Sequence, residues 1–190
     1  MKVKPASKPG NVLVEMKPLD DKLFASSAVQ DTPFKISTIL VPIDFSPLSR
    51  KALQYAVPFA RKHEARIVLV HVIEPVYYPE SYLATLPPEI EDVNIERARS
   101  AKQQLAELRK DDIGSEIPAD VLVETGRPWN EIINVAKDEN VDLIVIATHG
   151  HSGLKHVFLG STAERVVRHA PCPILVVREN EREFVRDESA

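Results

Sequence analysis

Residues 146–164 combine glycines with small polar residues in a pattern that could hold a phosphate. Three of the chain's six glycines fall in this stretch, and glycine lets the backbone take positive φ and lets a ligand approach the amides closely. Ser161 and Glu164 follow Gly160 with the S-x-x-E spacing of a capping box, which predicts a helix start. A helix N-terminus presents unpaired N–H groups and the positive end of the helix dipole. We therefore expect an anion site here, above all for a phosphate.

The same stretch gives little support to other chemistry. It contains neither the G-x-x-x-x-G-K-[ST] nor the G-x-G-x-x-G signature, and the segment from Gly150 to Gly153 lacks the G-x-S-x-G pattern of a hydrolase. His149, His151 and His156 have no clustered acidic residue or cysteine beside them, so we expect no metal site. We also expect no catalytic residue, because no acidic pair for magnesium accompanies these histidines.

Alternating strands and helices must position this stretch. The five runs richest in apolar residues predict strands at 36–43, 66–72, 119–125, 141–147 and 174–177. Helices are predicted after Ser46 as N-cap, over 89–110, from Pro128 and after Gly160, and Pro58 should kink or shorten the first of them. His71 in the second strand is more easily explained as a structural histidine than as a ligand. The alternation predicts an α/β fold, an open five-stranded parallel sheet with helices on both faces.

The strand order decides which residues can share a site. We expect the Rossmann-like order 3-2-1-4-5, which reverses between the first and fourth strands. Ligands bind beyond the carboxyl ends of strands at such a reversal. Asp44 ends the first strand and residues 148–150 follow the fourth, so both should face one crevice.

The chain divides by composition into three parts. Residues 1–33 form an N-terminal extension that is either flexible or, through the apolar patch at Val12, Leu13 and Val14, a docking or edge strand. Residues 34–178 hold the regular pattern of one domain, and residues 179–190 are a charged C-terminal tail.

Composition limits the partners and the compartment. The net charge of −4 argues against a nucleic-acid partner, and no apolar run approaches the ~20 residues of a membrane span. The single cysteine, Cys172, fits a reducing compartment and is read as a small buried side chain. We therefore expect a cytoplasmic protein with no membrane and no nucleic-acid partner.

The glycine stretch resembles the nucleotide motif of one known family. Gly150, nine intervening residues and then Gly160-Ser161 are similar to the G-x2-G-x9-G-[ST] pattern of the universal stress proteins of the UspA-like, ATP-binding type. The resemblance extends over about residues 36–177. It includes the segments 41–46, 68–72, 125–128 and 171–177.

The resemblance implies a set of ligand contacts. In ATP-binding members the adenine and ribose rest against positions that match Pro42, Ile43, Asp44, Val72 and Gly126. The phosphates, with or without Mg²⁺, lie along positions that match Gly150, His151, Gly160, Ser161 and Thr162, and Ala147 and His149 complete the implied site. Two positions depart from the motif. Ala147 stands where its first glycine is expected, and His151 stands where arginine or lysine is frequent.

The family also implies a function. The expectation is an adenine-nucleotide-binding stress protein that acts as a sensor or regulator through its partners and a homodimer formed by the edge strand from Ile174 to Val177. The alternative is a dimerising interaction module that binds no nucleotide. Slow ATP hydrolysis or self-phosphorylation at Ser161 or Thr162 is the most that the family suggests as enzymatic activity.

Overall fold

The structure is a computed structural model that describes residues 2–5, 12–15, 35–75, 90–148 and 159–179. The chain forms two compact units, Met1–Phe34 and Lys35–Ala190. In the first unit, β1 (Lys2–Pro5) pairs antiparallel with β2 (Val12–Glu15). The apolar patch of the N-terminal extension is therefore part of a two-stranded sheet of its own. The tail from residue 180 onward lies outside the described residues.

The second unit contains a five-stranded parallel sheet in the order β5-β4-β3-β6-β7. In chain order this is 3-2-1-4-5, which confirms the predicted topology. The strands are β3 (Thr38–Pro42), β4 (Arg66–Ile73), β5 (Ala119–Thr125), β6 (Leu143–Ala147) and β7 (Ile174–Val177).

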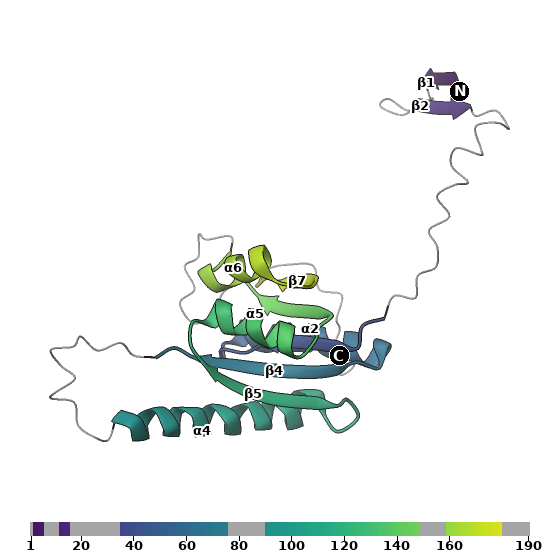
Figure 1. Cartoon of the computed structure of the whole chain (residues 1–190). Coiled ribbons are helices and arrows are strands. Elements are labelled where there is room, and N and C mark those ends of the chain that lie inside the picture. Colours follow the sequence, from purple (N-terminus) through teal and green to yellow (C-terminus); the bar gives the residue numbers. More distant parts are fainter. Residues whose placement is uncertain (1, 6–11, 16–34, 76–89, 149–158, 180–190) are drawn as a thin grey trace, which may run out of the picture. The chain divides into compact units, whose positions relative to one another are not determined.

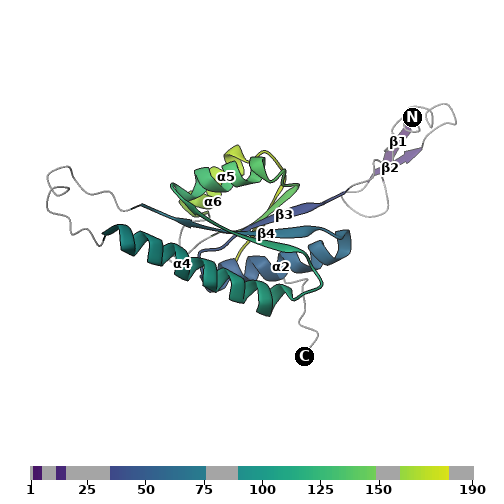
Figure 2. The same ribbon diagram turned by 60° about the horizontal axis from the view of Figure 1, so that its bottom comes forward.

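Helices cover both faces of this sheet (Figures 1 and 2). One face carries α2 (Pro47–His63) and α4 (Ile90–Leu108), which runs into a π-helical turn, η1 (Arg109–Ile113). The other face carries α5 (Pro128–Asp138) and α6 (Ser161–His169). Among the described residues, no helix is both long and apolar enough to cross a membrane.

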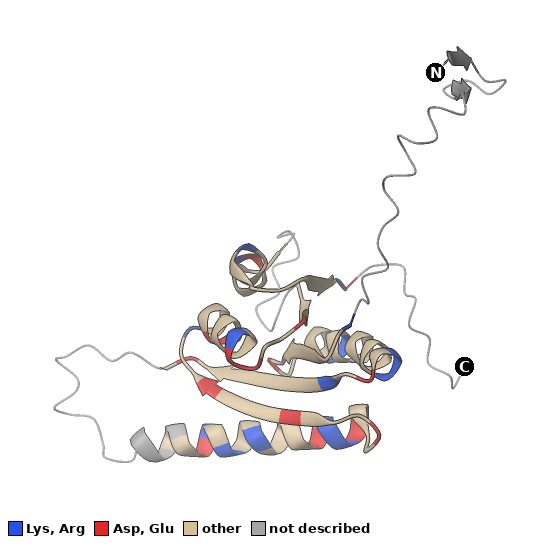
Figure 3. Cartoon of the chain, turned by 45° about the vertical axis from the view of Figure 1, so that its right-hand side comes forward, with Lys and Arg blue, Asp and Glu red and all other residues tan. Residues whose placement is uncertain are grey.

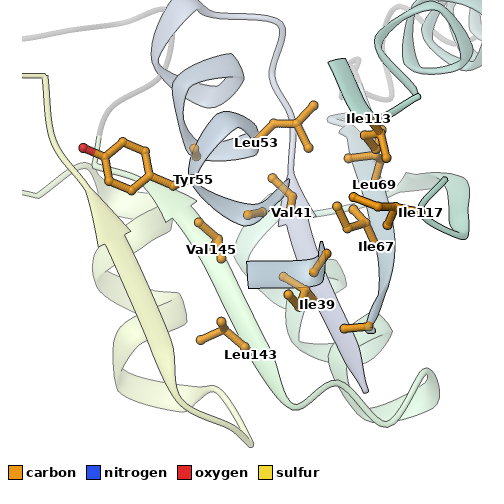
Figure 4. Close-up of a cluster of buried hydrophobic side chains, with 14 of the residues drawn as sticks. Ile39, Val41, Leu53, Tyr55, Ile67, Leu69, Ile113, Ile117, Leu143 and Val145 are labelled. Atoms are coloured by element: carbon orange, nitrogen blue, oxygen red, sulfur yellow. The ribbon is translucent and has the colours of Figure 1, made fainter. Parts of the chain in front are cut away.

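Each face of the sheet has its own apolar core, because side chains alternate along a strand. Ile39 and Val41 of β3 pack with Leu53 of α2 and Leu105 of α4, and Figure 4 shows part of this cluster. Leu40, between them in sequence, is fully buried in the cluster on the opposite face. Burying each such side chain contributes about 1.5–3 kcal/mol, so the two clusters supply the main driving force that holds the helices on the sheet.

Helix α2 begins as predicted and continues past its internal proline. Ser46 is its N-cap, with the Oγ accepting a hydrogen bond from the Ser49 N–H at 3.1 Å. Pro58 does not shorten the helix, which ends at His63. Proline removes the hydrogen bond to the carbonyl four residues earlier, here that of Gln54. Both residues are exposed, so water can satisfy that carbonyl.

Candidate functional site

A cavity of about 450 Å³ lies at the carboxyl ends of β3, β4 and β6. This volume is within the range of small-molecule sites, roughly 300–1,000 Å³. The cavity lies at the strand-order reversal, where an open parallel sheet binds its ligands. Its walls are Pro42, Ile43, Asp44, Ser49, Val70, His71, Val72, Glu74, Arg97, Pro128, Ile132, Ile146, Ala147, Thr148, Gly160, Ser161, Thr162 and Ala163.

The turn after β3 brings Asp44 to the cavity. Its Oδ1 accepts a hydrogen bond from the Ser46 N–H at 3.0 Å, which ties the carboxylate to the start of α2. The next residue, Phe45, has a φ of 64°, a left-handed conformation that costs a non-glycine residue about 1–3 kcal/mol. Strained backbone of this kind persists only where the surroundings fix it, and such residues cluster at functional sites.

His71 supports this strained turn from β4. Its Nδ1 lies 2.8 Å from the Ile43 carbonyl oxygen, and its ring lies 4.6 Å from the Phe45 ring between centroids. A carbonyl oxygen only accepts, so Nδ1 carries the hydrogen of this bond. This contact agrees with the structural role expected for His71, and the side chain also lines the cavity.

The first turn of α6 faces the cavity with its backbone donors uncapped. Gly160 is the N-cap and Ser161 is the first helical residue, with no side-chain cap. The predicted S-x-x-E capping box is therefore wrong. The Oε1 of Glu164 instead accepts hydrogen bonds from Arg168 one turn later. The N–H groups of the first turn have no partner inside a helix, so they can serve an anion.

The sequence suggested the Gly160 N–H as a donor to an anion, but this N–H already has a hydrogen-bond partner. The Gly160 N–H donates to the Thr148 carbonyl at 2.7 Å, and the Thr148 N–H donates to the Val177 carbonyl at 2.9 Å. These bonds fasten the start of α6 to the ends of β6 and β7. Within the described part of the chain, the donors that remain without a partner are consequently those of Ser161, Thr162 and Ala163.

The structure brings eight of the predicted site residues together. They are Pro42, Ile43, Asp44, Val72, Ala147, Gly160, Ser161 and Thr162, all on the cavity wall. His149, Gly150 and His151 lie outside the described residues.

Gly126 is placed beside the cavity lining rather than in it. Its N–H donates to the Ile73 carbonyl at 3.0 Å, which joins the end of β5 to the end of β4. A Cβ at this position would lie 2.6 Å from Oε1 of Glu131. A larger residue here would therefore displace the Glu131 side chain.

Two charged residues in the lining were missed by sequence reasoning. Glu74 follows the end of β4, and Arg97 reaches the cavity from α4. With Asp44 they give the described walls two acidic groups and one guanidinium. A signal for Arg97 was present, since it lies one turn before Ala101 and two turns before Leu105, on the stripe that packs on the sheet.

The described part of the chain offers no ready metal centre. No group of three or more histidine, cysteine, aspartate or glutamate residues converges within it. A magnesium ion in the cavity would need oxygen ligands from a bound phosphate as well as from the protein.

Comparison with known proteins identifies the family. The model of the universal stress protein family matches residues 35–178. Universal stress protein YxiE of Bacillus subtilis is 33% identical over 151 residues, which cover 74% of this chain and 97% of that protein. A universal stress protein of Thermus aquaticus is 36% identical over 145 residues, covering 74% of this chain and 98% of its own.

Solved structures share the fold. That of MJ0577, a universal stress protein of Methanocaldococcus jannaschii, has a TM-score of 0.67 at 27% identity and covers 78% of this chain and 100% of its own. A universal stress protein in complex with cAMP has a TM-score of 0.54 at 18% identity, with 77% of this chain and 100% of its own covered. One from Archaeoglobus fulgidus in complex with dAMP has a TM-score of 0.50 at 22% identity, with 76% and 99% covered. Because the family model spans most of the sequence and the curated relatives are matched over nearly their whole length, the chain belongs to the universal stress protein family.

Proposed function

We propose that this protein binds an adenine nucleotide, ATP in the first instance, and acts as a stress-response sensor or regulator through its dimer and partners. The proposal rests on one observation. The same cavity contains backbone N–H groups at an uncapped helix start and an apolar cleft. The Ser161 to Ala163 turn supplies the donors, and Ile43, Val72 and other apolar residues supply the cleft. A nucleotide has one end suited to each part. Distant members of the same fold hold cAMP and dAMP.

The phosphates belong at α6 in this proposal. Three backbone N–H groups and the positive helix end favour negative charge there. His149, Gly150 and His151 are proposed to complete this end, as the family motif implies. The base and ribose then extend toward Pro42, Ile43 and Val72, with Asp44 beside the ribose and Gly126 behind it.

Ala147 is compatible with this arrangement. It ends β6, is half-buried and lines the cavity, and its methyl group also packs against the core on the α2 side. The motif glycine would leave more room at this point, so the ribose is expected to lie slightly farther from β6. ATP with Mg²⁺, ATP alone and AMP are consequently all reasonable first ligands to test.

Calorimetric titration with ATP and AMP tests the proposal. We expect saturable binding by the wild-type protein and its loss in Val72→Phe, which projects a ring into the cavity. The matched control is Glu124→Phe, because Glu124 pairs with Val72 in the β4–β5 register but lies outside the cavity lining. Absence of binding by the wild-type protein at millimolar nucleotide would contradict the proposal.

A second copy of the chain is the partner we propose for the edge strand β7. Ile174, Leu175 and Val176 are only half-buried at the end of the sheet, where an edge strand has unpaired backbone groups. A dimer through this edge would also serve a nucleotide-free interaction module, the alternative function. Sedimentation equilibrium should give a dimer, and a monomer at every protein concentration measured would contradict this assembly.

The remaining parts of the chain fit the same proposal. We infer a family domain over residues 34–178, with the extension 1–33 and the tail 179–190 outside it. The antiparallel β1–β2 pair gives the extension structure of its own, which favours a docking role. We place the protein in the cytoplasm.

A further inference from the structure

Arg97 occupies an unusual place on α4. The side chains at 97, 101 and 105 are spaced by four residues and so form one stripe of the helix. Ala101 and Leu105 are 4% and 0% exposed against the sheet, but Arg97 is exposed and lines the cavity. Val93, one further turn toward the N-terminus, is 54% exposed. The stripe therefore passes from the core to the mouth of the cavity.

The overhang of α4 explains this change. Both ribbon views show the first turns of α4 beside the carboxyl end of β4 (Figures 1 and 2). Position 97 lies beyond the part of this stripe that is buried against the sheet, so an apolar side chain there would have nothing to pack on. Figure 3 shows acidic and basic residues along α4, and Arg97 is one of several charged residues of this helix.

Arg97 and the first turn of α6 lie toward opposite ends of the cavity. Helix α4 packs on β4 and β5, whereas α6 follows β6, on the other side of β3. If the phosphates lie at α6, the base lies toward β4. We propose that Arg97 contacts the base of the bound nucleotide and determines affinity for it, an inference that rests on the proposed adenine-nucleotide function.

The chemistry of the guanidinium suits a base. It is planar, always charged and weakly hydrated, and it stacks on aromatic faces. Among the described residues, Arg97 makes no hydrogen bond or ion pair, so its guanidinium is not committed to an acid. Val70 and Val72 of β4, which pack on the α5 side of the sheet, add apolar side chains to the same lining. In this proposal a purine packs on these apolar side chains with Arg97 against its other face, and Glu74, which also lines the cavity, accepts from its exocyclic amine.

Arg99, on the same helix, provides a matched control for the substitution of Arg97. Its guanidinium pairs with Glu96 at 3.2 Å, its side chain is 73% exposed, and it does not line the cavity. Arg97→Ala and Arg99→Ala remove the same charge and both raise helix propensity, so each should fold. Arg97→Lys keeps the charge but loses the planar group.

The experiment measures dissociation constants of adenosine, AMP and ATP for the wild type and these three variants. Stacking of a cation on an aromatic ring contributes about 0.5–2 kcal/mol, so Arg97→Ala should weaken all three ligands by a similar factor of about 2- to 30-fold. Arg97→Lys should weaken binding of the three ligands by most of the same factor. Arg99→Ala should bind as the wild type does.

Each other outcome has a distinct meaning. A loss that grows from AMP to ATP and spares adenosine would place Arg97 at the phosphates and overturn the proposal. Equal binding by Arg97→Ala and Arg99→Ala would also overturn it, while leaving the nucleotide function intact. If the wild type bound none of the ligands at millimolar concentration, the nucleotide function itself would fail.

Discussion

Replacing Gly160 by aspartate should raise stability and lower nucleotide affinity at the same time. Gly160 is the N-cap of α6, with φ −65° and ψ 154°, a conformation open to any residue. Aspartate is a better N-cap than glycine by a few tenths of a kcal/mol, and a carboxylate at a helix N-terminus contributes about 0.3–1 kcal/mol more. Gly160→Asp should therefore stabilise the protein by about 0.5–1 kcal/mol, or raise Tm by about 1–4 °C.

The same carboxylate should compete with the ligand. It would accept from the donors of the Ser161 to Ala163 turn and repel a phosphate. Losing one hydrogen bond to a charged group costs about 1.5–3 kcal/mol, so ATP affinity should fall by about tenfold or more. Calorimetric titration and thermal unfolding on one protein preparation would give both quantities.

Two further substitutions separate the causes. Gly160→Asn caps the helix without charge and should give a smaller loss of ATP affinity than Gly160→Asp. Gly160→Ala adds a Cβ without an acceptor, so it should bind ATP nearly as the wild type does and be slightly less stable. If Gly160→Asp kept wild-type ATP affinity with its raised Tm, the placement of phosphates at α6 would be refuted.

Two other predictions concern the scaffold. Leu105→Ala should lower the free energy of unfolding by about 2–5 kcal/mol, because Leu105 of α4 is 0% exposed. Urea denaturation measures this free energy, and a change below about 1 kcal/mol would contradict the packing of α4 on the sheet. Partial burial, followed by the nearby Asp142 carboxylate, raises the pKa of the half-buried Cys172 thiol. Alkylation at pH 8 should therefore be slower in the folded protein than in urea, and equal rates would contradict the partial burial of this thiol.

Most of the fold could be predicted because its signals are local. The third predicted strand, 119–125, and the proline that starts α5 are found where expected, since a β-branched run and a proline act within a few residues. Strands β3 and β6 are shorter than their apolar runs. The start of β3 at Thr38 is explained by Asp142. Its Oδ2 accepts hydrogen bonds from the Ser37 and Thr38 N–H groups at 2.7 and 3.0 Å, just before the strand pairing begins.

The site was harder to predict because it depends on contacts far apart in sequence. The capping-box pattern at Ser161 was misleading, since Glu164 pairs with Arg168 and the Gly160 N–H is taken by Thr148. Arg97 carried a correct spacing signal, but only the position of α4 relative to the end of β4 shows that this stripe reaches the cavity. The π-helical turn Arg109–Ile113, which extends α4 beyond the predicted helix end, had no recognised sequence signal.

Whether the cavity holds an adenine nucleotide can be read from the ligand that the protein carries through purification. The protein is purified without added nucleotide and denatured, and the released small molecules are identified by mass spectrometry. The Gly160→Asp protein prepared in parallel shows whether the released ligand depends on the α6 donors. We expect ATP or AMP from the wild type and much less of either from Gly160→Asp. Release of no adenine nucleotide, with no uptake when millimolar ATP or AMP is added back to folded protein, would contradict it.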